Sequence, residues 1–193
     1  MNETTTAGPT GAEGARVPPA PPAEPEVHDP VHKSAYAFEQ RGESLWVYTW
    51  FDPDAHLPEH FHPSYEERWE AVEGTLRVKL AGTWRDLTPA DGPVLVERNV
   101  RHEVRNESGA RVVGRTEVTP PGRLIEFLTG SARAAREGLY NARNLPTSWR
   151  GAMWIAEFAY SFREDTVVTS PPPALQRILL PPLARLAQRR KRS

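Results

Sequence analysis

The stretch that most constrains the fold runs from residue 54 to residue 74 and reads DAHLPEHFHPSYEERWEAVEG. Side chains of a β-strand alternate between two faces, so His60 and His62, separated by one residue, point to the same side. Glu67 follows a short turn later and can fold back onto that side, and His102 in the segment VRHEVRN offers a fourth group of this kind. Imidazole and carboxylate ligands suit Zn, Fe, Ni or Mn. The pattern therefore predicts a site for one divalent transition metal in a β-barrel.

The spacing of these residues resembles the first motif of the cupin superfamily, in which H-x-H is followed by four residues, a glutamate, six residues and a glycine. His60, His62, Glu67 and Gly74 occupy these positions. The resemblance covers about residues 31–119 and is to single-domain cupins of the quercetin dioxygenase-like type. It implies a mainly β fold, an antiparallel β-barrel or jelly roll, with His60, His62, Glu67 and His102 as metal ligands. The activities it implies range from dioxygenases, isomerases, decarboxylases and polyketide cyclases to binding proteins without chemistry, and the fold alone does not choose among them.

The second cupin motif, P-x-G-x-x-H-x-x-x-N, is matched in part. His102 and Asn106 stand at the family spacing, whereas Glu97 replaces the proline and Asn99 the glycine. Asp54 likewise stands where a glycine usually opens the first motif. Asn and Asp tolerate a positive φ better than other non-glycine residues, so these two replacements should preserve the turns. Glu97 brings a charge to the rim of the site and is the candidate catalytic group for proton transfer; a surface glutamate that ends a strand is the alternative interpretation.

Glu66 is the alternative carboxylate ligand. Counting back from Gly74 selects Glu67, and alternation with a period of two places the neighbouring glutamates on opposite faces, so both cannot be ligands. Trp69 shares the face of Glu67 and either walls the pocket or packs in the ordinary core. The sequence assigns no role to the remaining histidines, His28, His32 and His56, although His56 lies close enough to support the site.

Length and composition restrict the class of protein. A chain of 193 residues suggests one domain with appendages. The formal net charge of -1 argues against a nucleic-acid partner, and the absence of cysteine excludes disulfides and thiolate ligands. The N-terminus lacks a basic flank followed by an apolar run, and no stretch reaches the ~18–20 apolar residues of a membrane-spanning helix. We therefore expect a cytoplasmic protein whose partner is a small-molecule substrate or ligand.

The chain divides into three parts. Residues 1–30 are rich in Pro, Ala, Gly, Thr and Glu, a composition that cannot offset the entropy of ordering, and we expect a disordered leader. Residues 31–119 carry short strands at the spacing of an antiparallel barrel. Within them, residues 45–51 alternate between two apolar faces, which suits either a homodimer interface or helices that fold back onto the barrel.

Residues 120–193 are expected to form a helical extension. Residues 123–138 have helical spacing with Gly138 as C-cap, and the segment GAMWIAEFAYSF reads as a buried helix. The segment PALQRILLPPLARLAQRRKRS carries a leucine stripe, a predicted break or kink at Pro181–Pro182 and a basic end. Residues 174–192 would suit an anionic membrane surface, but we favour leucines packed on the barrel with the arginines in solvent.

Two functional hypotheses follow from these features. The first is a metal-dependent enzyme, dioxygenase-like, that acts on a small oxygenated organic molecule bound at open metal positions. The second is a non-catalytic cupin that binds or senses a small molecule, with a membrane-peripheral location through its C-terminal helix. Metal analysis followed by oxygen uptake with candidate substrates distinguishes the two hypotheses.

Overall fold

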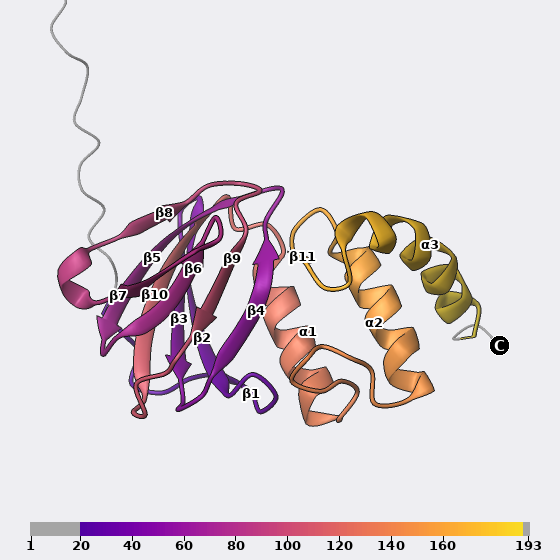
Figure 1. Cartoon of the computed structure of the whole chain (residues 1–193), viewed down its shortest axis with the longest axis horizontal. Helices are drawn as coiled ribbons and strands as arrows, with labels where there is room; N and C mark the ends of the chain where they lie inside the picture. The colour runs from indigo at the N-terminus through magenta and orange to yellow at the C-terminus, as the bar shows by residue number, and fades with distance from the viewer. Residues whose placement is uncertain (1–19, 191–193) are drawn as a thin grey trace, which may run out of the picture.

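The structure is a computed structural model that describes residues 20–190, without the side chains of residues 189 and 190. Two antiparallel sheets face each other to form the barrel, and three helices line up along one side of it (Figure 1). The first nineteen residues of the predicted leader and the last three residues of the chain lie outside the described part. The predicted fold class, an antiparallel β-barrel followed by C-terminal helices, is confirmed.

The two sheets account for all the strands of the described chain. The first sheet contains, in spatial order, β1 (Val27–Asp29), β2 (Ser34–Arg41), β3 (Ser44–Phe51), β10 (Val112–Thr119), β5 (Glu66–Glu73) and β8 (Val94–Val96). The second contains β11 (Val167–Val168), β4 (His56–Phe61), β9 (His102–Arg105), β6 (Leu76–Leu80) and β7 (Thr83–Leu87). A short 3-10 helix, η1 (Pro89–Asp91), links β7 to β8. Alternate apolar side chains of both sheets form the barrel core, as a half-buried strand pattern predicts.

Strand β3 is buried on both faces within a single chain. Leu45 and Val47 belong to the core, while Trp46 and Tyr48 on the other face are 7% and 0% exposed. The Arg115 guanidinium lies 5.7 Å from the ring centre of Trp46 and covers part of that face. Burial of these aromatic side chains therefore does not require a second chain, and the homodimer stays a prediction.

Ordered structure begins inside the range predicted to be leader. Strand β1 pairs with β2, and the side chain of Asp29 is buried. Its carboxylate accepts hydrogen bonds from His32 Nδ1 at 2.9 Å and from the Tyr140 hydroxyl at 3.3 Å. The three-residue strand V-H-D is too short to alter the average composition of residues 1–30, which is why the predicted boundary at residue 31 falls too late.

The three helices are α1 (Leu124–Arg136), α2 (Trp149–Ser161) and α3 (Pro173–Arg190). Gly138 follows α1 with a φ of 67°, the left-handed conformation expected of a C-cap glycine. Helix α3 does not break at Pro181–Pro182, because both prolines lie inside it, and the alternative, a kink, stays a prediction. Proline has a helical φ, and the carbonyls that lose their helical donors belong to Arg177 and Ile178, whose exposed positions leave them open to water.

The apolar surfaces of α2 and α3 differ from the sequence-based expectation. Helix α2, expected to be buried, buries fully only Gly151 and Ala156. Helix α3 packs against α2 and buries Ala184 and Ala187, so the favoured packing of its leucines on the barrel is wrong. The exposed stripe of α3 contains Leu175, Ile178, Leu179 and Leu186. No helix in the described chain is long and apolar enough to cross a membrane.

Candidate metal centre

An irregularity in β4 aims the first histidine into the barrel. Leu57 pairs with Val104 and His60 pairs with His102. These two pairs are three residues apart in β4 but only two residues apart in β9, which defines a β-bulge in β4. Such a bulge adds one residue to the strand and shifts the alternation of everything after it. Leu57 and His60 therefore both face inward, and Glu59 lies on the outer face. His62, two residues after His60, returns to the inner side.

The structure brings three of the predicted ligands together. His60, His62 and His102 offer ring nitrogens that all lie within 4.8 Å of one another, a set that could hold a metal ion. His60 Nε2 and His102 Nε2 are only 3.0 Å apart. Two nitrogens bound to one ion at ~2.1 Å have this spacing when their bonds are roughly perpendicular. The two strands β4 and β9 set this distance, because the two histidines are paired across the ladder.

Backbone carbonyls fix the orientation of all three imidazoles. Nδ1 of His60 donates to the carbonyl of Pro58 at 2.7 Å, and Nδ1 of His102 donates to that of Val100 at 2.8 Å. Nδ1 of His62 lies 3.1 Å from the carbonyl of Asp165. A carbonyl accepts but cannot donate, so the proton of each neutral ring sits on Nδ1. Each Nε2 then presents a lone pair to the centre, the arrangement found in metal-ligating histidines.

The converging lone pairs form a donor set that could hold a cation. Nε2 of His62 is buried without a hydrogen-bond partner, and the Nε2 atoms of His60 and His102 face each other. Protonation does not occupy these lone pairs near neutral pH, because burial lowers the pKa of His60 to about 4. Burial and the neighbouring imidazoles also hold the pKa of His62 and of His102 well below the ordinary value. A divalent ion satisfies the same nitrogens without protonating them, so the donor set fits the predicted metal.

Glu67, the fourth predicted ligand, lies beside the cluster. Its Oε1 is 3.4 Å from His62 Nε2 and its Oε2 is 3.6 Å from His102 Nε2. The indole N–H of Trp69 donates to Oε2 at 2.7 Å, so Trp69 both walls the pocket and orients the carboxylate. Burial raises the pKa of Glu67 to about 7, although the Trp69 hydrogen bond acts in the opposite direction. A nearby cation would favour the charged carboxylate.

The helical extension completes the surroundings of His62, which the sequence did not reveal. The Thr166 hydroxyl lies 3.2 Å from His62 Nδ1 and 3.0 Å from the Tyr65 hydroxyl. The Tyr65 ring stacks on His62 with ring centres 4.3 Å apart. Asp165 and Thr166 lie more than a hundred residues after His62, in the turn before β11. No local spacing could have identified them, because only the return of the chain to β4 brings them there.

The departures from the two motifs differ in their structural consequences. Asn99 and Asp54 both have a φ of 63°, so each adopts the conformation in which glycine would ordinarily stand. The amide of Asn106 donates to the carbonyls of Phe51, Asp52 and Ala110 and holds the loop beside the site. Glu97 follows β8 and is exposed. Two cavities are lined in part by His60, and Glu97 lines neither of them.

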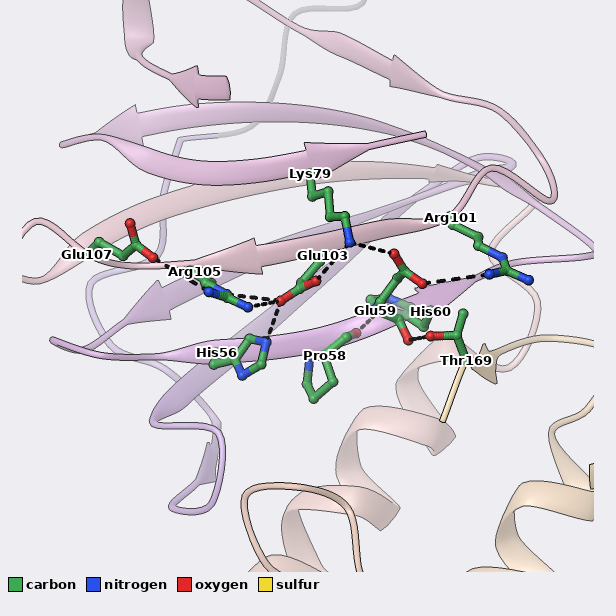
Figure 2. A network of polar contacts seen from close by, with 10 residues as sticks. All are labelled: His56, Pro58, Glu59, His60, Lys79, Arg101, Glu103, Arg105, Glu107 and Thr169. Carbon is green, nitrogen blue, oxygen red and sulfur yellow. Dashed lines mark hydrogen bonds and ion pairs between the residues drawn. The ribbon is translucent and has the colours of Figure 1, made fainter. Parts of the chain in front are cut away.

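His56 lies on the outer face of the barrel rather than beside the histidine cluster. Its Nε2 is 2.8 Å from Glu103 Oε1, within a network that includes Lys79, Arg105 and Glu59 (Figure 2). This network occupies the opposite side of β4 and β9 from His60 and His102. His28 lies in β1, and His32 belongs to a separate buried cluster with Asp29.

The sequence matches no family model and no curated protein. Among solved structures, an RmlC-like cupin from Shewanella frigidimarina is 21% identical, with a TM-score of 0.46 over 53% of this chain and 89% of that chain. KdgF from Halomonas sp. is 18% identical, with a TM-score of 0.45 over 51% of this chain and 90% of that chain. An oxalate oxidase in complex with the substrate analogue glycolate is 18% identical, with a TM-score of 0.41 over 46% of this chain and 52% of that chain.

The class of fold follows from the chain itself. Two antiparallel sheets close around the motif histidines, and the residues replacing the motif glycines keep a positive φ. The protein therefore has a cupin-type barrel, as its resemblance to that superfamily implied.

Proposed function

We propose that the protein is a metal-dependent enzyme that acts on a small oxygenated organic molecule. In this proposal His60, His62, Glu67 and His102 hold one Fe, Mn, Ni or Zn ion. A bound divalent ion with an open position supplies Lewis-acid chemistry or, for a redox-active metal, oxygen chemistry. Dioxygenase-like activity is the reaction class to test first. Glu97 stays the sequence-based candidate for proton transfer, although it lines neither of the cavities bordered by His60.

One observation carries the proposal. His60 Nε2 and His102 Nε2 face each other at 3.0 Å, while each Nδ1 is occupied by a backbone carbonyl. In the absence of a cation this pair would hold two lone pairs against each other in a buried site, at a cost to folding. The orphaned Nε2 of His62 points to the same need.

The chain's own residues prepare this site before any substrate arrives. The Pro58 and Val100 carbonyls hold the rings of His60 and His102, so little ordering is left to occur on binding. Trp69 holds the Glu67 carboxylate through its indole N–H. Burial of His62, Glu67 and His102 keeps bulk water away from the centre and strengthens electrostatic interactions there.

Metal analysis of protein purified without chelators tests the first part. We expect about one divalent ion per chain, or uptake of one ion when Fe, Mn, Ni or Zn is supplied. Chelation should lower the melting temperature, because the ion stabilises only the folded state. Oxygen uptake with flavonols, diketones and aromatic diols then tests the reaction class. A protein that retains no metal after reconstitution would contradict the proposal as a whole.

A non-catalytic binding or sensing protein is the second candidate. The exposed stripe of α3, which includes Leu175 and Ile178, favours a peripheral position at an anionic membrane. Co-sedimentation with vesicles containing anionic lipid, together with metal binding but no turnover of the substrate panel, would support it. Light scattering in solution tests the homodimer, and cell fractionation tests the cytoplasmic location.

A further inference from the structure

The helical extension meets the barrel in two different ways. Helix α1 packs directly on the barrel, since Leu124 belongs to a core cluster with Leu45 and Val118. Helices α2 and α3 pack on each other, and a cavity of about 720 Å³ lies between α2 and the barrel. The attachment of the α2–α3 pair therefore depends on local contacts. Residues 165–169, called the strap here, make one set of these contacts, with β4 and with the loop that follows it.

The strap supports the end of β4 that carries His60. Its strand β11 pairs with this end, and Thr169 donates to the carbonyl of Glu59 through its amide at 3.0 Å and its hydroxyl at 3.1 Å (Figure 2). On the other side of β4, the ladder with β9 is irregular at the same place because of the bulge. The side-chain amide of Gln176 donates to the carbonyl of Val168 at 2.6 Å and ties the strap to α3. The strap thus connects the α2–α3 pair to the strand of two proposed ligands.

The strap also contacts the imidazole of His62 directly. The carbonyl of Asp165 lies 3.1 Å from His62 Nδ1, and the hydroxyl of Thr166 lies 3.2 Å from the same nitrogen. Both oxygens accept from the proton on Nδ1, which leaves the hydroxyl proton of Thr166 for the Tyr65 oxygen at 3.0 Å. The His62 ring is therefore held between the stacked Tyr65 ring and the strap. All four side chains are buried, so water does not readily replace a hydrogen bond that is lost here.

We propose that Thr166 is a positioning residue for the metal ligand His62, and that metal binding and the attachment of the α2–α3 pair stabilise each other through the strap. Hydrogen-bond acceptors at the second ring nitrogen orient a metal-bound imidazole. For the other two histidines these acceptors are the Pro58 and Val100 carbonyls of the barrel, whereas for His62 they come from the extension. Such coupling is reciprocal: a strap that raises metal affinity is itself stabilised by the metal by the same factor. The inference rests on the metal-binding part of the proposed function and not on the reaction.

Substitutions of similar shape in the strap test the positioning role. Thr166→Val removes the hydroxyl at His62 and keeps the branched side chain, so it should weaken binding of Zn²⁺ to the full chain about tenfold. Thr166→Ser keeps the hydroxyl and should restore most of the affinity. Thr169→Val is the matched control, because the Thr169 hydroxyl bonds to the Glu59 carbonyl, which the Thr169 amide also satisfies. Competition with a metallochromic chelator measures each affinity.

Three results would overturn the positioning role. The first is an affinity for Zn²⁺ in Thr166→Val equal to that of the natural sequence. The second is an equal loss in Thr169→Val, which would show that any loosening of the strap has the same effect. The third is a Thr166→Ser protein that binds Zn²⁺ as weakly as Thr166→Val does.

Hydrogen exchange on the natural sequence tests the coupling without any substitution. The amide of Thr169, which donates to the Glu59 carbonyl, should exchange about fivefold or more slowly once Zn²⁺ is bound. The amides of β7 are the control, because β7 is the opposite edge strand of the same sheet, and their exchange should change little. Unchanged exchange in the strap, or equal slowing in β7, would overturn the coupling.

The same measurements separate this inference from the proposed function. Zn²⁺ binding that depends on Thr166, in a protein that turns over none of the substrate panel, would support the inference and contradict the enzyme proposal. Turnover by a metal-loaded protein, with unchanged Zn²⁺ affinity in Thr166→Val and unchanged exchange in the strap, would do the reverse. A natural sequence that takes up none of the four candidate ions would overturn both.

Discussion

Both faces of strands β4 and β9 carry histidine side chains, but the surroundings of these histidines differ. On the outer face, Glu103 lies between His56 at 2.8 Å and Arg105 at 2.6 Å, and Lys79 lies 3.0 Å from Glu59 (Figure 2). On the inner face, His60 and His102 turn their Nε2 atoms toward each other. Outside, each carboxylate is matched by a cation of the protein. Inside, the imidazoles present lone pairs to one another and form a donor set that could hold a metal ion.

The comparison teaches that histidines near carboxylates do not by themselves define a metal site. The decisive differences are burial, which keeps the inner imidazoles neutral, and the carbonyls that occupy their Nδ1 atoms. His56 lies four residues from His60 on the same strand, yet its partner is an ion-paired glutamate. Four substitution experiments test this contrast, in order of decreasing expected effect.

Removing a histidine from each face should give the largest difference. His60→Ala should weaken metal binding at least ~100-fold, since even residues that only orient a ligand typically account for ~10–100-fold. His56→Ala should leave metal content unchanged, because its imidazole faces away from the cluster. Metal content by plasma mass spectrometry checks both. Equal loss in the two variants would contradict the separation of the two faces.

Neighbouring glutamates of β5 give the next contrast. Glu67→Gln should weaken metal binding about tenfold or more, because it removes the charge beside His62 and His102 while keeping an acceptor for Trp69. Glu66→Gln should have no such effect, since it lies on the opposite face of the strand. Competition with a metallochromic chelator measures both affinities. Intact binding in Glu67→Gln, with loss in Glu66→Gln, would reverse the carboxylate assignment.

On the outer face, a charge change should affect stability and leave metal binding unchanged. Glu103→Gln removes the charge of a side chain that is only 8% exposed and lies beside Arg105, Lys79 and His56. We expect the free energy of unfolding to fall by ~1–3 kcal/mol, which corresponds to a melting temperature lower by several degrees. Glu107→Gln is the control, because the carboxylate of Glu107 is exposed and 3.8 Å from Arg105. A change in metal affinity without a change in stability would contradict this outcome.

The smallest effect should depend on pH. Burial alone would raise the pKa of Glu59, but hydrogen bonds from Lys79 and Thr169 and the charges of Lys79 and Arg101 outweigh it and lower that pKa. The unfolded chain therefore binds this proton more readily, and the stabilisation is present above the ordinary pKa of 4.5 and lost as pH falls below it. Glu59→Gln should lower stability by at most ~1 kcal/mol near neutral pH.

Thermal unfolding at several pH values measures the Glu59 effect. The difference between Glu59→Gln and the natural sequence should shrink as the solution is made more acidic. A difference that instead grows toward low pH would show that the charge of Glu59 does not stabilise the fold.

The sequence determined the barrel and the candidate donors, because both depend on local periodicity. The alternation of TLRVKL gives β6. The spacing from His60 to Gly74 identifies His60, His62 and Glu67, and the spacing of His102 and Asn106 adds the fourth group. The structure gathers the three histidines into a tight cluster. The turns at Asp54 and Asn99 were also predictable, since few side chains tolerate a positive φ.

Tertiary structure alone decided how the helices meet the barrel. Two sets of contacts join residues about a hundred positions apart: those of His62 with Asp165 and Thr166, and the hydrogen bond between His32 and Asn144. The local repeats of a strand (two residues) and of a helix (3.6 residues) do not predict contacts at such a separation. The same reason explains the errors over α2 and α3. An apolar pattern indicates which side of a helix avoids water, but it does not say whether a packed core, a cavity or another helix lies on that side.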